Sequence, residues 1–115
     1  MARICIIGAG VSGLVAGRSL HKAGHQVKVL EKSRSFSGRC ATRLWNDHIV
    51  DHGVQYFTAQ NETFFEQVKT IAGAGLRAIQ APICDERSQP LRSGKARYYL
   101  KEGNNRLGKY LALDF

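Results

Sequence analysis

Three glycines near the N-terminus have the spacing of a phosphate-binding turn. In the stretch ICIIGAGVSGLVAG, Gly8, Gly10 and Gly13 directly follow an apolar run. In a Gly-x-Gly-x-x-Gly turn the first glycine permits a tight turn, and the second lets a pyrophosphate approach the main chain. The third lets the following helix lie close to the sheet. Because the N–H groups at the start of such a helix attract phosphate, the pattern predicts a dinucleotide-binding site.

A carboxylate follows this turn at the distance typical of nucleotide-binding units. Glu31 ends the next apolar segment, QVKVLE, about twenty residues after the glycines. At that place it can accept hydrogen bonds from an adenosine ribose, and its charge disfavours NADP by repelling a 2′-phosphate. NAD and FAD remain alternatives, although Gly17 extends the glycine pattern in a way that is commoner in FAD proteins. A glycine-rich turn without a ligand is the remaining alternative.

The elements that position these residues follow from the apolar pattern. We predict a strand over residues 3–7 that is buried on both faces of a parallel sheet. A helix over 11–23 then ends at Gly24, and a second strand covers 26–31. Strand, helix and strand form a right-handed βαβ unit. The buried side of the helix is expected to hold Val11, Leu14, Val15 and Leu20.

The rest of the chain predicts an added hairpin and helices. A loop over 32–43 leads into a hairpin that turns at Asn46 and Asp47. A helix begins at Glu62, with Asn61 as its N-cap. The later elements are a loop with at most one strand over 76–95, a strand over 97–100, and a last helix capped by Asn104 or Asn105. The predicted fold class is α/β, a Rossmann-like βαβ dinucleotide-binding unit with an added β-hairpin and helices that form an incomplete domain.

Composition and charge exclude several classes of protein. The chain has 115 residues, 43% of them hydrophobic and 23% charged, as expected of one globular domain. Its longest apolar run falls short of the roughly 20 residues that cross a bilayer, so we expect a cytoplasmic protein without a membrane partner. The net charge is +8, and the excess lies in residues 1–43 and 87–115. Since no run of consecutive Lys or Arg occurs, an anionic cofactor explains the first block better than a nucleic acid does.

The cysteines argue against a disulfide framework and a metal site. Cys5, Cys40 and Cys84 are odd in number, far apart and without a Cys-x-x-Cys pair. Cys5 is expected to act as a small hydrophobic residue inside the first strand. We therefore predict no bound metal, and no arrangement of nucleophile and base identifies a catalytic residue.

Four blocks of the sequence together resemble a family. RICIIGAGVSGLVAGRSL, VKVLEKS, SGRCATR and DHGVQYFTA follow one another over residues 1 to about 70. In order and spacing they resemble the FAD-dependent amine oxidase-like flavoproteins, and within them the renalase-like branch. The resemblance implies FAD as the cofactor. It also implies that the loop after the second strand lies against FAD through a Gly-Gly-Arg motif, which here is Ser37-Gly38-Arg39.

The resemblance extends the expected site beyond the turn. It implies that the segment VDHGVQYFT runs close to the flavin ring, with Gly53 letting the backbone pass and Gln55 facing the ring. The alternatives are that Arg39 is an ordinary surface arginine and that Asp51 and His52 only cap a turn. The residues expected to bind the cofactor are Gly8, Gly10, Val11, Ser12, Gly13, Glu31, Lys32, Gly38, Arg39, Gly53 and Gln55.

The resemblance further implies the N-terminal part of an oxidoreductase that passes electrons from an amine, or from a reduced dihydropyridine nucleotide, to oxygen. Residues 1–75 would form the FAD-binding portion. Residues 76–115 would begin the connection to a substrate domain that this chain does not contain. Alone, the chain is then expected to be inactive and to self-associate. An NAD-binding dehydrogenase-type domain and a catalytically silent truncated fragment are the alternatives.

Overall fold

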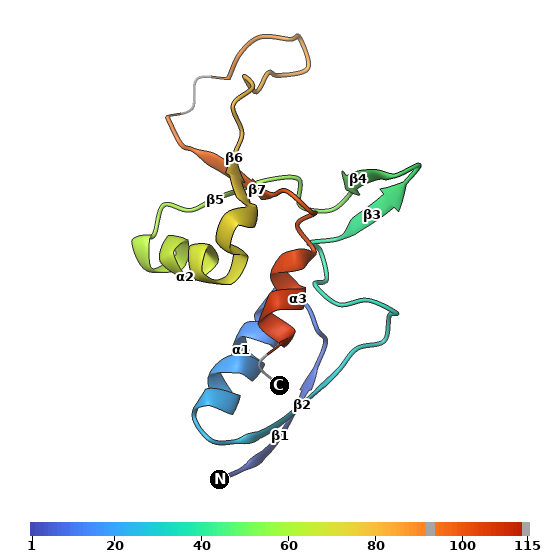
Figure 1. The fold of residues 1–115 in the computed structure, drawn as a ribbon, viewed down its shortest axis with the longest axis vertical. Coiled ribbons are helices and arrows are strands. Elements are labelled where there is room, and N and C mark those ends of the chain that lie inside the picture. The colour runs from blue at the N-terminus through green and yellow to red at the C-terminus, as the bar shows by residue number, and fades with distance from the viewer. Residues whose placement is uncertain (92–93, 114–115) are drawn as a thin grey trace.

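A computed structural model describes residues 1–91 and 94–113 (Figure 1). The molecule is elongated, with extents of 54 × 34 × 24 Å. The first two strands and the first helix form one end, and the second helix and a three-stranded sheet lie toward the other. In chain order the elements are β1 (Arg3–Ile7), α1 (Val11–Lys22), β2 (Gln26–Leu30), β3 (Thr42–Trp45), β4 (His48–Asp51), β5 (Phe57–Thr58), α2 (Glu62–Ala72), the 3-10 turn η1 (Gly73–Gly75), β6 (Leu76–Ala78), β7 (Arg97–Leu100) and α3 (Arg106–Ala112).

The βαβ unit is present as predicted. β1 and β2 pair in parallel, from Arg3 opposite Gln26 to Ile7 opposite Leu30, and α1 connects them. Parallel strands need such a crossover because a tight turn reverses the chain direction and would make the strands antiparallel. Together with the hairpin and the other helices, this unit confirms the predicted α/β fold class.

The strand burial differs from the prediction. Ile4 and Ile6 are half-buried, but Cys5 is exposed and Ile7 is 80% exposed. Ile6 lies toward α1, because its Cγ2 atom is 3.4 Å from the position of a β-carbon added to Gly13. One face of the two-stranded sheet is thus packed, and the other is open among the residues that the structure describes. Cys5 lies within β1 as expected, but it is not buried, and the expectation of a strand buried on both faces was wrong.

The burial of α1 also departs in part from its predicted pattern. Leu14 is 3% exposed and packs in the core with Leu107 and Leu111 of α3. Val15, predicted on the same side, is 45% exposed. Gly17 takes part in the buried side instead. The packing of α3 on α1 therefore buries a narrower side of α1 than its apolar residues alone predict.

The added hairpin agrees with its prediction. Thr42 pairs with Asp51, and Trp45 pairs with His48, in an antiparallel β3–β4 ladder. Asn46 and Asp47 connect the strands with φ angles of +46° and +63°. Two successive positive φ angles define the turn that matches the twist of a two-residue hairpin, and Asn and Asp tolerate them better than most residues.

The second half of the chain builds a helix and a small antiparallel sheet. Asn61 caps α2 as predicted, since its side-chain oxygen accepts from the N–H of Phe64 at 2.9 Å. β7 lies between β5 and β6 and pairs antiparallel with both. β6 is the one strand predicted within 76–95, and the residues after it add an isolated bridge between Cys84 and Pro90. Residues 92–93 of that segment lie outside the described residues.

α3 joins the two ends of the molecule but is not capped as predicted. Asn105 occupies the N-cap position without a side-chain hydrogen bond to the helix. The Asn104 side chain turns away from it, accepting from Leu100 N–H at 2.8 Å and donating to Val54 C=O at 2.7 Å. Asn104 therefore tethers the helix start to β7 and to the segment between β4 and β5. The buried core runs through α3 and consists of Ala9, Leu14, Val68, Ala72, Leu100, Leu107 and Leu111.

Candidate nucleotide-binding site

The three glycines of the turn are needed for different reasons. Gly8 has a φ of +99°, which side chains rarely adopt, and its N–H donates to Leu30 C=O at 2.7 Å. A β-carbon on Gly13 would lie 2.2 Å from the Gly8 carbonyl oxygen, so the turn and α1 touch through main chain. Gly10 has an ordinary φ of −71°, and the nearest atom to an added β-carbon is Gly38 Cα at 3.9 Å. Neither conformation nor packing within the described chain requires glycine at position 10.

The start of α1 presents main-chain donors beside this glycine. The helix begins at Val11. Its first helical hydrogen bond to the turn joins the Leu14 N–H to the Gly10 C=O at 3.0 Å. Gly10 has no side chain with which to cap the helix, and the first turn holds no acidic residue. The N–H groups of Val11, Ser12 and Gly13 therefore precede the helical ladder and carry its partial positive charge. This arrangement suits an anion such as a phosphate.

Glu31 is held against the turn by both of its oxygens. Oε2 accepts from Ala9 N–H at 2.8 Å, while Oε1 accepts from Ser33 N–H at 3.0 Å and from Ser33 Oγ at 3.1 Å. These bonds stabilise the ionised form and lower the pKa of the Glu31 carboxyl below its usual range. The Ser33 N–H contributes most, followed by the Ala9 N–H and then the Ser33 hydroxyl. Since a carboxylate has about four acceptor sites, it can still accept from a ribose hydroxyl.

We expect this part of the turn to respond to acid. A lowered folded-state pKa means that the contribution of Glu31 is present above the usual glutamate pKa of about 4.3, and is lost as the pH falls through the lowered value. In an NMR pH titration, the Ala9 and Ser33 amide resonances should shift with a midpoint below that usual value. Glu31→Gln should remove the transition. A wild-type midpoint above 4.3 would contradict the hydrogen-bond geometry.

The loop after β2 returns to the glycine-rich turn at Ser37-Gly38. Ser37 forms a parallel bridge with Gly10, and its N–H donates to Ala9 C=O at 2.8 Å. A β-carbon on Gly38 would lie 3.1 Å from Gly10 Cα, so the two glycines face each other closely. The structure thus brings Gly38 to the glycine-rich turn.

The other predicted residues are exposed or packed against main chain. Lys32, Arg39 and Gln55 are exposed. The Arg39 carbonyl accepts from Val54 N–H at 2.9 Å, which leaves its guanidinium uninvolved in that contact. A β-carbon on Gly53 would lie 2.0 Å from the Arg39 carbonyl oxygen. Packing of two main-chain segments therefore explains Gly53 without a flavin.

Sequence reasoning missed three partners of the predicted residues. Ala9 supplies an N–H to Glu31, and Ser33 supplies two donors to the same carboxylate. The contact of Ser33 with Glu31 could have been predicted, since a hydroxyl two residues after an acidic side chain commonly forms a local hydrogen bond with it. The third partner is Asn105, whose carbonyl accepts from Ser37 Oγ at 2.6 Å. No local sequence pattern predicts a contact between residues that lie 68 positions apart in the chain.

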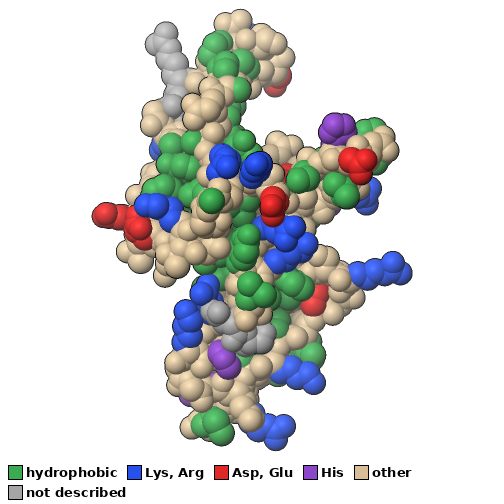
Figure 2. All heavy atoms as spheres, viewed as in Figure 1, with side chains coloured by type: hydrophobic (Ala, Val, Ile, Leu, Met, Phe, Trp, Pro, Cys, Tyr) green, Lys and Arg blue, Asp and Glu red, His purple; other side chains and the backbone are tan. Residues whose placement is uncertain are grey.

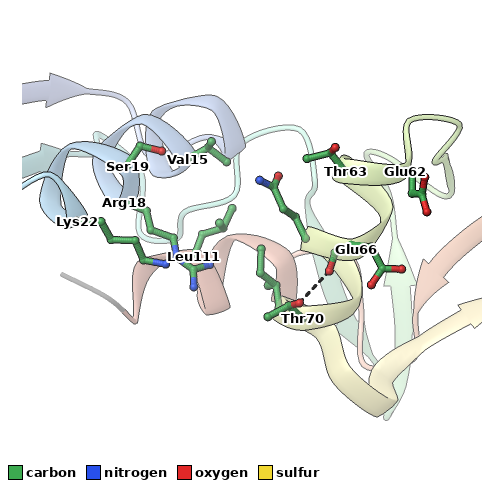
Figure 3. A pocket seen from close by; sticks show the side chains of 11 residues that line it. Val15, Arg18, Ser19, Lys22, Glu62, Thr63, Glu66, Thr70 and Leu111 are labelled. Atoms are coloured by element: carbon green, nitrogen blue, oxygen red, sulfur yellow. Dashed lines mark hydrogen bonds between the residues drawn. The ribbon is translucent and has the colours of Figure 1, made fainter.

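Two hollows bear on where a ligand would lie. One of about 220 Å³ opens beside the predicted residues and is lined by Glu31, Ser33, Ser35, Phe36, Gly38, Ala41, Thr42, His52 and Asn105. A larger cleft, of about 690 Å³, separates α1 from α2 (Figure 3). Arg18 and Lys22 lie on its α1 side, and Glu62 and Glu66 on its α2 side. The smaller hollow borders Glu31 and also Gly38, the residue that faces Gly10 of the glycine-rich turn.

Charge and metal-binding residues do not point to another site. In Figure 2 the Lys and Arg side chains lie in several separate groups on the visible face. Within residues 1–91 and 94–113, no three His, Cys, Asp or Glu side chains are placed to hold a metal ion. Burial, and next the charge of Asp51, raise the pKa of the Cys40 thiol, which keeps it protonated at neutral pH. Across the same described ranges, no helix has the length and apolar character that a membrane span needs.

Comparison with known proteins identifies the class of this unit. The family of NAD(P)-binding Rossmann-like domains matches residues 6–71, more than half of the chain. The chain therefore belongs to that family.

Individual relatives include flavin enzymes. The chain is 39% identical over 67 residues to an L-amino-acid oxidase of Sistrurus catenatus edwardsii, covering 58% of this chain and 13% of the oxidase. It is 44% identical over 45 residues to a flavin-dependent L-tryptophan oxidase of Lentzea aerocolonigenes, covering 39% and 10%. An uncharacterized protein of Methanothermococcus thermolithotrophicus is 38% identical over 60 residues, which are 52% of this chain and 58% of that protein. The predicted likeness to flavin oxidases is confirmed at this general level.

Solved structures give the same picture. A fatty acid isomerase from P. acnes superposes with a TM-score of 0.59 at 27% identity, over 70% of this chain and 19% of that one. A variant of putrescine oxidase superposes with a TM-score of 0.58 at 26% identity, over 71% and 18%. The chain thus spans about a fifth of the length of these enzymes.

Proposed function

We propose that this chain is the N-terminal, FAD-binding part of a flavin-dependent oxidoreductase. The amino-acid and tryptophan oxidases among its relatives support a flavin cofactor. When bound, FAD supplies the redox chemistry. The residues of this chain bind and orient its adenosine diphosphate half, with the α1 N-terminus toward the pyrophosphate and Glu31 toward the ribose.

The conformation and surroundings of Gly10 are the main support for this proposal. Gly8 and Gly13 are glycines because of a positive φ angle and a main-chain contact. Gly10 has neither constraint, and it lies at the uncapped start of α1, across from Gly38. A missing side chain at that place leaves room for an atom group from outside the chain. The adjacent N–H groups favour a negatively charged group at that place, and a pyrophosphate fits this description.

The division of the chain is part of the proposal. Residues 1–75 form the FAD-binding portion, and residues 76–115 begin the connection to a substrate domain outside this chain. The family match over residues 6–71 supports the first boundary. α3, from the second part, packs back on α1, so the connecting segment contributes to the stability of the nucleotide-binding portion.

We further propose that the whole enzyme oxidises an amine or a reduced dihydropyridine nucleotide and passes the electrons to oxygen, as in the renalase-like branch. The likeness to putrescine oxidase and the amino-acid oxidases supports an amine-type substrate. Residues of this chain touch the dinucleotide, and the substrate-binding residues lie outside it.

An NAD-binding dehydrogenase-type domain is the second candidate. The matched family is described by NAD(P) binding, and Glu31 suits the ribose of either dinucleotide. The two candidates differ in colour. A whole protein purified with a flavin absorbs near 450 nm, whereas one that carries NAD does not.

Glu31→Gln tests the assignment of the ribose site. The amide has one acceptor oxygen in place of two, so we expect ADP to bind more weakly by roughly 1 kcal/mol, about a fivefold loss. Discrimination against adenosine 2′,5′-bisphosphate should relax, because the repelling charge is gone. Calorimetric titration of both ligands measures the two effects. Glu66→Gln, on the exposed side of α2, is the matched control. Unchanged affinity and unchanged discrimination would refute the assignment.

A further inference from the structure

Ser37 adopts a backbone conformation that ordinarily belongs to glycine. Its φ is +93°, and the residue is 1% exposed. A buried non-glycine residue with such a φ persists only where its surroundings hold it. Two hydrogen bonds do so. The Ser37 N–H donates to Ala9 C=O at 2.8 Å, and its Oγ donates to Asn105 C=O at 2.6 Å.

α3 provides a matching surface for this serine. A β-carbon on Gly108 would lie 1.9 Å from Ser37 Oγ and 2.9 Å from Ser37 Cα. No larger residue at position 108 can coexist with the serine in its present place. Ser37 and Gly108 are therefore complementary, although they lie far apart in the sequence.

The start of α3 is itself fixed to the β3–β4 hairpin. The Asn105 N–H donates to Thr42 Oγ1 at 3.0 Å, and the Asn104 N–H donates to Asp51 Oδ1 at 2.9 Å. Thr42 Oγ1 in turn donates to the same Asp51 oxygen at 2.5 Å. These bonds give the Asn104–Asn105 turn one position relative to the loop that carries Ser37.

The contact leads directly to the nucleotide site. Ser37 bridges Gly10, and its neighbour Gly38 faces Gly10 Cα. We propose that Asn105 and Gly108 of the α3 segment are positioning residues that, through Ser37, hold the Ser37–Gly38 turn against Gly10 and so set dinucleotide affinity. The inference rests on the proposed function, because the turn being positioned is taken to bind a dinucleotide.

Three variants of the 115-residue chain test this contact. Ser37→Ala keeps the unfavourable φ but loses the bond to Asn105, and Gly108→Ala inserts a methyl group against Ser37. Ser37→Gly combined with Gly108→Ala removes the Oγ and Cβ atoms that the methyl group would meet. We measure the amide exchange rate of Ser37 by NMR, relative to amides of α2, and the affinity for ADP. Both single variants should accelerate the relative exchange of Ser37 and weaken ADP binding roughly fivefold or more, and the double variant should recover part of each loss relative to Gly108→Ala.

Asn61→Ala is the matched control, because it also removes a side-chain-to-backbone hydrogen bond, at α2. It should lower stability without changing the relative Ser37 exchange or ADP affinity. If Gly108→Ala does not fold, Ser37→Ala decides the question. Unchanged Ser37 exchange and ADP affinity in Ser37→Ala would overturn the inference. If the folded wild-type chain binds no ADP, the proposed function fails, while the exchange rates still decide whether α3 positions the turn.

Discussion

Replacing Gly10 with valine is expected to abolish dinucleotide binding while the chain stays folded. The φ of −71° at this position suits any L-residue, and an added β-carbon meets Gly38 Cα only at 3.9 Å. The valine side chain would instead occupy the space in front of the α1 N–H groups, where the pyrophosphate is placed. Titration calorimetry with ADP measures the loss, and circular dichroism checks the fold. Equal affinity in the variant would refute the assignment of the turn.

Gly13→Ala gives the contrasting result in the same turn. Its methyl group would lie 2.2 Å from the Gly8 carbonyl oxygen, so the main chain of the turn or of α1 must move. Overpacking of this kind costs about 1–3 kcal/mol or more. We therefore expect Gly13→Ala to lower the free energy of unfolding, and Gly10→Val to lower affinity. Together the two variants distinguish a glycine that the fold needs from a glycine that the ligand needs.

The second large effect concerns the chain by itself. We expect residues 1–115 to show no oxidase turnover, to retain FAD weakly or not at all, and to self-associate. The β1–β2 sheet has two strands and one open face among the described residues, and Ile7 is 80% exposed. Burying such a side chain contributes about 1.5–3 kcal/mol, so a second copy gains by covering this face. Unpaired strand edges promote the same association.

Gel filtration with light scattering, flavin absorbance and oxygen consumption measure these properties together. An amine such as putrescine and a dihydronicotinamide nucleotide serve as the substrates. Replacing Ile7 with a lysine should reduce association, because it places a charge on the open face. A monodisperse yellow monomer that consumes oxygen with either substrate would contradict this account.

Local features of the fold were predictable because neighbouring residues determine them. The Asn46–Asp47 turn needs two residues that tolerate positive φ, and Asn61 needs only the N–H of Phe64 three residues later. The βαβ unit likewise follows from apolar runs and glycines in one short stretch. The place of Glu31 at the end of the second strand likewise follows from spacing, although its bond to the Ala9 N–H was not predicted.

Features that depend on distant partners could not be predicted. Burial of β1 and of Val15 depends on which elements cover them, and an apolar pattern does not show whether such a partner is present. Asn104 or Asn105 was expected to cap the last helix, but Asn105 makes no side-chain cap bond, and the Asn104 side chain bonds to Leu100 and Val54. The positive φ of Ser37 depends on α3, which begins 69 residues later at Arg106. Sequence spacing carries no signal for such a contact.

The most direct test of the nucleotide site is an NMR titration of the 115-residue chain with ADP, which follows every amide at once. The account predicts that shifts concentrate at Gly8, Gly10, Gly13, Glu31 and Gly38, and that Gly10→Val removes them. No shifts at millimolar ADP in the folded chain would contradict the account. Shifts confined to the cleft between α1 and α2 would contradict it as well.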